Sequence, residues 1–170
     1  MAGYIIPLRF DIMFRLPVLC LLALTLCAGD DPFAGTWKLD SDKSKFKLGA
    51  PKIMFGAIQI ETGNGFLKST ASGSDNEGFV SDFTFNCALD GTPCSVVAAT
   101  PMKGAWAVDT IALKRINDRT INATGTKDGK LVYVDTRTVS ADGATLTVQR
   151  NGTTPDGKKY ESTLVLIKTR

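Results

Sequence analysis

The sequence predicts an all-β protein that folds as an antiparallel up-and-down β-barrel of about 8–10 strands. Short segments alternate apolar and polar residues with a period of two, as half-buried strands do. Asp-Gly pairs, which favour tight hairpin turns, separate several of these segments, and helical periodicity is weak. Antiparallel sheets of this size form barrels or sandwiches because both hide the strand edges, and sequential hairpins favour the barrel.

The turns divide the chain into short strands. Asp-Gly pairs begin at residues 90, 128, 142 and 156, and loops are expected at 72–78 and 101–107. Segment 40–46 could form one short turn capped by Asp40 or Ser41. The predicted strands are 35–39, 53–62, 66–71, 79–88, 95–99, 109–116, 120–126, 130–139, 145–150 and 159–168.

Residues 1–29 have the layout of a secretory signal peptide. Arg15 precedes an apolar run at 16–26, which small residues follow, and Met13 is a second plausible start. The run is too short for a permanent membrane helix. A buried N-terminal helix fits poorly, and leucines before the two leader cysteines disfavour a lipid anchor. We therefore expect 30–170 to be a single barrel domain without an integral membrane segment, secreted or periplasmic after cleavage.

The two later cysteines, Cys87 and Cys94, bracket a turn. In an exported chain this arrangement predicts one disulfide. Two free thiols are the alternative in a reducing compartment. A metal pair lacks support because the chain has no histidine and no third thiol nearby, so we expect no metal and no cofactor.

Composition weighs against several functions. The chain has 20 Lys and Arg against 17 Asp and Glu, spread singly, which disfavours a dedicated nucleic-acid surface. The lack of histidine excludes a serine–histidine triad and the usual zinc sites. A pair of carboxylates remains a catalytic possibility. We expect no enzyme, because turn chemistry accounts for most aspartates: Asp75, Asp90, Asp128, Asp142 and Asp156.

The segment 130–139 holds the most informative polar residues, Tyr133, Asp135 and Arg137, which share one face of the strand. If that face is interior, the arginine beside the aspartate could receive a ligand's carboxylate. The alternative places the intervening valines inside and the charged row in solvent, and the cost of burying unpaired charge favours it. Aromatic residues could line a cavity or fill the core, chiefly Phe83, Phe85 and, near a loop, Trp106.

The stretch "FAGTWKLDSDKSKF" resembles the first strand of the calycins, the lipocalins and fatty-acid-binding proteins. The resemblance implies that Phe33, Gly35 and Trp37 are structural residues at the closed end of a barrel. In that family an arginine near the C-terminus covers the tryptophan, a place that Lys168 or Arg170 could take here. Segments 31–39, 113–121 and 140–148 are also similar to a group of exported, lipocalin-like bacterial proteins.

Two functions are therefore open. The leading hypothesis is non-covalent binding of a small hydrophobic or amphipathic ligand inside the barrel, and an internal arginine that receives a carboxylate has its counterpart in fatty-acid-binding proteins. The alternative is a filled barrel that acts through its surface, as a protein-interaction or inhibitor module of the cell envelope. The sequence leaves the oligomeric state open.

Overall fold

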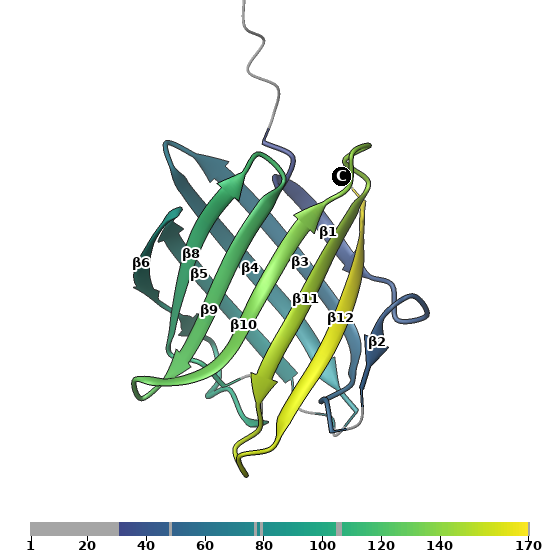
Figure 1. Ribbon diagram of the computed structural model, residues 1–170, viewed down its shortest axis with the longest axis vertical. Helices are drawn as coiled ribbons and strands as arrows, with labels where there is room; N and C mark the ends of the chain where they lie inside the picture. Colours follow the sequence, from purple (N-terminus) through teal and green to yellow (C-terminus); the bar gives the residue numbers. More distant parts are fainter. Residues whose placement is uncertain (1–30, 48, 77, 79, 105–106, 170) are drawn as a thin grey trace, which may run out of the picture.

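Twelve antiparallel strands form one sheet in the computed structural model, which describes residues 31–47, 49–76, 78, 80–104 and 107–169 (Figure 1). The strands are β1 (Gly35–Leu39), β2 (Lys45–Phe46), β3 (Ile53–Gly63), β4 (Phe66–Asp75), β5 (Val80–Ala88), β6 (Asp90–Ser95), β7 (Val97–Ala98), β8 (Thr110–Asn117), β9 (Thr120–Lys127), β10 (Lys130–Val139), β11 (Thr145–Thr153) and β12 (Lys159–Lys168).

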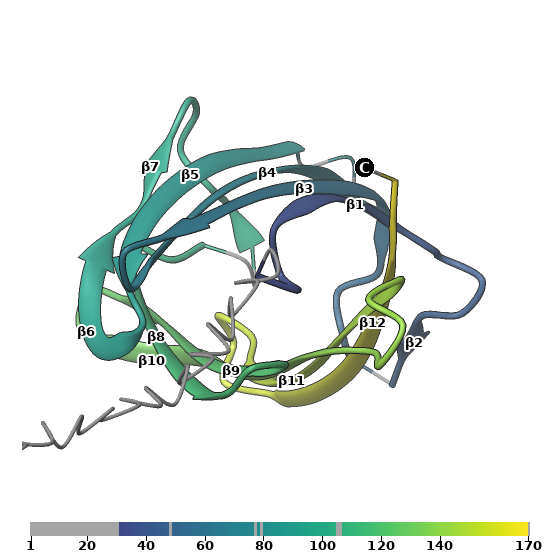
Figure 2. The same cartoon turned by 90° about the horizontal axis from the view of Figure 1, so that it is seen from above.

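The strands follow one another around a barrel, with β1 placed between β12 and β3. Figure 2, the view from above, shows the resulting ring. The predicted fold class is confirmed, and the sequence did not predict strands at β2 or over most of β6. The hairpin between β9 and β10 turns at Asp128-Gly129, where both φ angles are positive, at 50° and 72°. Such angles require residues that tolerate the left-handed region.

The barrel closes between β5 and β8 in a way that the sequence did not predict. Strand β6 pairs with β8, whereas β7 pairs with β5, so the segment 90–98 passes from one edge of the sheet to the other. The prediction of one strand at 95–99 is therefore wrong, because its residues divide between these two pairings.

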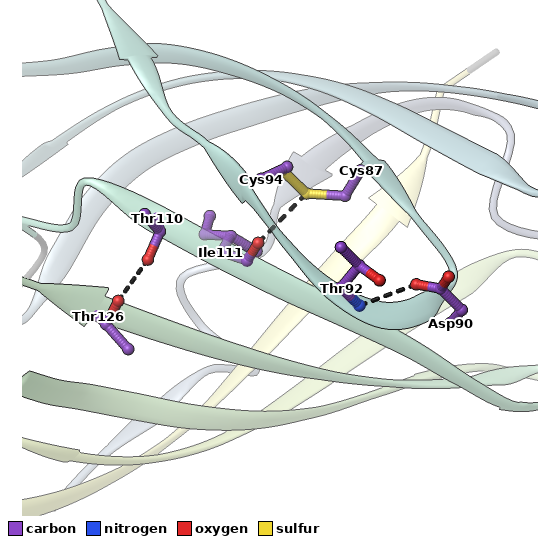
Figure 3. The surroundings of a disulfide bond; sticks show 7 residues. All are labelled: Cys87, Asp90, Thr92, Cys94, Thr110, Ile111 and Thr126. Atoms are coloured by element: carbon purple, nitrogen blue, oxygen red, sulfur yellow. Dashed lines mark hydrogen bonds between the residues drawn. A yellow bond between two sulfur atoms is a disulfide. The ribbon is translucent and has the colours of Figure 1, made fainter. Parts of the chain in front are cut away.

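The disulfide between Cys87 and Cys94 joins β5 to β6 across this closure (Figure 3). The two Cα atoms are 5.3 Å apart, and the Cys87 side chain is fully buried. Because β6 is hydrogen-bonded to β8, the bond ties the two edges of the sheet together. The predicted pairing of the two cysteines is present.

Strand β4 is longer than predicted and takes in part of the expected loop at 72–78. The stretch "SGSD" has a loop-like composition, but its backbone pairs on both sides. Ser74 lies opposite Val80 of β5, and Asp75 lies opposite Ile53 of β3. The predicted turn after β1 is present, with Asp40 accepting a hydrogen bond from the Lys43 backbone N–H at 3.2 Å.

One end of the barrel is filled around Trp37, which is fully buried. Its indole Nε1 donates a hydrogen bond to the Phe33 carbonyl at 2.9 Å, and the Lys168 Nζ lies 5.1 Å from the centre of the ring. Gly35 enters β1 with a φ of 131°, which other residues rarely adopt. The structure places Lys168 over the tryptophan, while Arg170 lies outside the described residues.

Two further expectations, the signal peptide at 1–29 and the role of Trp106, fall outside the described residues, as does Phe79, the first residue of the predicted strand 79–88. No helix of the length and apolarity that a bilayer crossing needs is found in the described ranges.

Candidate functional site

A cavity of about 130 Å³ lies inside the barrel, between β3–β5 on one side and β10–β12 on the other. The wall from β3–β5 is largely apolar, with isoleucines, phenylalanines, alanines and glycines, and it also carries several serines and Asp75. The opposite wall carries the charged groups from β10 and β11. The hypothesis of a surface-acting barrel assumed a filled interior, and the structure instead has space in this half of the barrel.

The alternation of β10 places Tyr133, Asp135 and Arg137 inside, where all three line the cavity. Tyr133 and Asp135 are buried, whereas Val134 is 40% exposed. The arrangement that the sequence favoured, with the valines inside, is therefore wrong. That prediction rested on the cost of burying unpaired charge inside the barrel. The buried aspartate has a further partner, which the prediction did not take into account.

That partner is Arg150 of β11, which lies directly opposite Asp135 in the register of the two strands. Its Nε donates to Asp135 Oδ1 at 2.7 Å and one terminal nitrogen donates to Oδ2 at 2.8 Å. Arg137 donates a third hydrogen bond to Oδ2 at 3.1 Å. Charge-assisted, bidentate bonds of this kind offset the cost of burying the ions.

The cluster holds more positive than negative charge, because one carboxylate serves two guanidinium groups. The Nε of Arg137 is buried and has no hydrogen-bond acceptor among the described residues. Asp75, the other carboxylate that lines the cavity, lies at the last residue of β4. The interior therefore offers a donor for a group that accepts hydrogen bonds.

The electrostatics keep these groups charged. Burial alone would raise the pKa of Asp135, but the charge and hydrogen bonds of Arg150, with a smaller effect of Arg137, hold it below the usual value. The pKa of Arg150 is raised because Asp135 outweighs desolvation. Burial raises the pKa of Tyr133 and of Tyr160, so both phenols stay neutral at physiological pH.

Tyr133 and a neighbouring glycine fix the position of the guanidinium. The Arg150 Cζ lies 3.7 Å from the centre of the Tyr133 ring, a stacked cation–π contact. On the other side of β10, Gly125 of β9 lies opposite Tyr133, and a Cβ atom on this glycine would come within 2.6 Å of the tyrosine ring. The glycine therefore leaves the space that the tyrosine fills.

The predicted aromatic residues of β5 form part of the opposite wall. The rings of Phe83 and Phe85 are 6.3 Å apart and inclined by 19°, and both line the cavity. Phe85 is buried and Phe83 is partly buried. The structure thus brings together the polar residues of β10 and the phenylalanines of β5, on facing walls.

Sequence reasoning missed Arg150, although a signal for it was present. In "TLTVQR" the apolar Leu146 and Val148 alternate with polar residues, and Arg150 continues the apolar face. The turn at Asp142-Gly143 sets the register of β10 and β11, which brings Arg150 opposite Asp135. An arginine in phase with buried residues, opposite an aspartate, is the pattern of an internal ion pair.

The described residues contain no group of three or more histidine, cysteine, aspartate or glutamate side chains that could hold a metal ion. No protein-family model matches the chain, and no curated protein matches it. Among solved structures, it is similar to a redesigned β-barrel, mFAP1, bound to DFHBI, with 15% identity and a TM-score of 0.44 over 78% of this chain and 94% of that one. A related redesigned barrel, mFAP0, also bound to DFHBI, has 16% identity and a TM-score of 0.40 over 78% of this chain and 97% of that one.

Proposed function

We propose that this protein binds a small amphipathic molecule non-covalently inside its barrel, with the acidic group of the ligand held by Arg137. The single observation that carries the proposal is a cavity with a largely apolar wall on one side and two guanidinium groups on the other. Ligand sites typically combine a largely apolar lining with a few placed polar groups.

Arg137 is the residue best placed to receive the ligand. Arg150 already gives two hydrogen bonds to Asp135, whereas Arg137 gives one and keeps a buried Nε without an acceptor in the described part of the chain. A carboxylate would supply that acceptor and balance the second positive charge. In this role Arg137 binds and orients the ligand, and no bond is made or broken.

We also propose a cellular compartment and a protein family for this chain. The disulfide favours an oxidising compartment, which agrees with export directed by residues 1–29. The opening "FAGTW" and the barrel support a lipocalin-like protein of the calycin type. We therefore propose a secreted or periplasmic binding protein rather than an enzyme.

The test is native mass spectrometry of the protein purified from the cells that express it, followed by extraction of the bound molecule. We expect an adduct on the wild-type protein that is lost in Arg137→Leu. That variant keeps Asp135 paired with Arg150, so the fold should survive. Arg119→Leu, at an exposed turn position, is the matched control and should keep the adduct.

Isothermal titration with benzoate and octanoate, two small acids with apolar bodies, extends the test to a protein that loses its ligand during purification. Binding of at least one acid, reduced in Arg137→Leu and unchanged in Arg119→Leu, is the expected result. A protein that carries no adduct and binds neither acid would contradict the proposed function.

A further inference from the structure

We propose that the cavity selects a planar aromatic acid of one ring and discriminates against chain-like acids. The inference rests on the proposed function and adds the shape and size of the ligand. It comes from the arrangement of large and small side chains on β3, β4 and β5, which the proposed function does not use.

The inner face of β4 forms the floor of a slot. Its inward residues are Ser69, Ala71 and Gly73, all of which line the cavity. Ala71 lies between Ile58 of β3 and Phe83 of β5 in the register of the three strands. A small residue between two large ones leaves a trough about one side chain wide, because neighbouring strands are only about 4.8 Å apart.

The same order recurs one step further along β4. Ser69 lies between Ile60 and Phe85, and all three are buried, so the trough at Ala71 closes at this level. The rings of Phe83 and Phe85 are stacked, with their centres 6.3 Å apart and their planes inclined by 19°, so Phe83 packs against Phe85 at this closed end. We therefore expect a flat ring to fit edge-on between Ile58 and Phe83 more closely than a thicker, puckered ring of the same size.

Near the end of β4 the residues on both sides of the slot are small. Gly73 lies between Gly56 and Ser81, and all three line the cavity. These small residues leave room in the cavity at this level, beside the side chains of Leu39 and Ile53, which lie near Gly56.

The cavity volume limits the length of the ligand. At about 130 Å³ it is close to the roughly 150 Å³ of a buried cavity that admits benzene. Pockets for drug-sized molecules measure about 300–1,000 Å³. One ring with a carboxylate therefore fills the space, while a long alkyl chain would leave most of its length outside.

The charged wall supplies the orientation. Arg137 and Arg150 face the cavity from β10 and β11, across from the slot. A ring that stands edge-on in the trough directs a carboxylate on its outer edge toward them. Among the described residues that line the cavity, the other ionisable groups are Tyr133, Asp135 and Asp75, and only the two arginines are cationic.

The experiment is isothermal titration of the full-length protein with four probes of similar size: benzoate, cyclohexanecarboxylate, benzamide and octanoate. We expect benzoate to bind at least about tenfold more tightly than cyclohexanecarboxylate or octanoate, since misfit in an apolar pocket costs about 10–200-fold. Benzamide, which keeps the shape and loses the charge, should also bind at least about tenfold more weakly, because hydrogen bonds to ionised groups are the stronger kind.

A pair of variants tests the slot itself. Ala71→Leu fills the floor and should abolish benzoate binding. Thr70→Leu adds the same side chain at the next residue of β4, which is exposed, and should leave binding unchanged. The comparison of probes on the wild-type protein needs no variant, so the inference stays testable if Ala71→Leu fails to fold.

The outcomes separate the two proposals. Octanoate or cyclohexanecarboxylate binding as tightly as benzoate, with Arg137→Leu weakening it, would overturn the planar-ring inference and leave the proposed function standing. Equal binding of benzamide and benzoate would overturn the requirement for an acid. No binding of any of the four probes would overturn the inference, and the mass-spectrometric test then decides the proposed function.

Discussion

Asp135 and Arg150 lie directly opposite each other on β10 and β11 and share two hydrogen bonds, of 2.7 and 2.8 Å. Both side chains are buried, and Arg137 adds a third bond to the same carboxylate. The pair allows two arginines to line a largely apolar cavity. It therefore connects the stability of the barrel with the chemistry of the candidate site.

Removing the carboxylate charge should destabilise the fold strongly. Asp135→Asn keeps the size of the side chain but removes the carboxylate charge that Arg150 and Arg137 share. Breaking a buried ion pair from one side costs about 3–5 kcal/mol, so we expect the free energy of unfolding in urea at pH 7 to fall by about that amount. Asp156→Asn, in an exposed turn, is the control and should unfold at nearly the wild-type urea concentration. A similar urea midpoint for both variants would show that the buried pair adds no stability.

The Asp135 carboxylate should also make the stability of the fold depend on pH. Its folded-state pKa lies below the unfolded value of about 3.9, so its contribution is present above that pH and is lost as the pH falls through the folded pKa. We expect the difference in unfolding free energy between wild type and Asp135→Asn to shrink below about pH 4. Urea titrations between pH 7 and pH 2.5 measure it. A difference that stays constant over that range would mean that Asp135 does not titrate with unfolding.

The sequence predicts the barrel well because its signals are local. Asp-Gly pairs mark turns and alternation marks strands, and both act over a few residues, so the long strands are found close to their predicted places. The closure of the barrel is different. Whether residues 90–98 pair with β5 or with β8 depends on how the two edges of the sheet meet, which no local pattern contains.

At the candidate site, local sequence likewise did not predict which face of β10 lies inside the barrel. Both faces of "LVYVDTRTV" carry residues that a barrel interior could accept, and the cost of unpaired charge favoured the wrong face. The deciding residue, Arg150, lies on the next strand and acts through the pairing register. Charge inside a barrel is predictable only when both members of the pair are read together.

The disulfide at the closure should contribute measurable stability. It spans a separation of seven residues, and loop-entropy models give such a link about 2–3 kcal/mol. We expect Cys87→Ser/Cys94→Ser to lose about that much in urea unfolding. Hydrogen exchange should quicken most in β5, β6 and β8, because the link holds these strands together. The matched comparison is wild type treated with a reductant, which should behave like the double variant. Unchanged exchange in these strands would contradict the assigned role at the closure.

Gly152 of β11 should not tolerate a side chain. A Cβ atom there would lie 2.3 Å from Tyr160 Cζ and 2.5 Å from its hydroxyl, so the buried ring must move. We expect Gly152→Ala to cost about 1–3 kcal/mol, as overpacking of a core does. Gly63→Ala, whose Cβ would meet nothing within 4 Å, is the control and should be nearly neutral.

A double-mutant cycle separates this clash from other effects of adding a methyl group to a strand. In a Tyr160→Ala background, Gly152→Ala should cost much less than in wild type, because the ring that it displaces is gone. The measurement is urea unfolding of the four proteins of the cycle. Equal costs in both backgrounds would show that the contact between Gly152 and Tyr160 does not set the packing, and that the glycine is needed for its backbone alone.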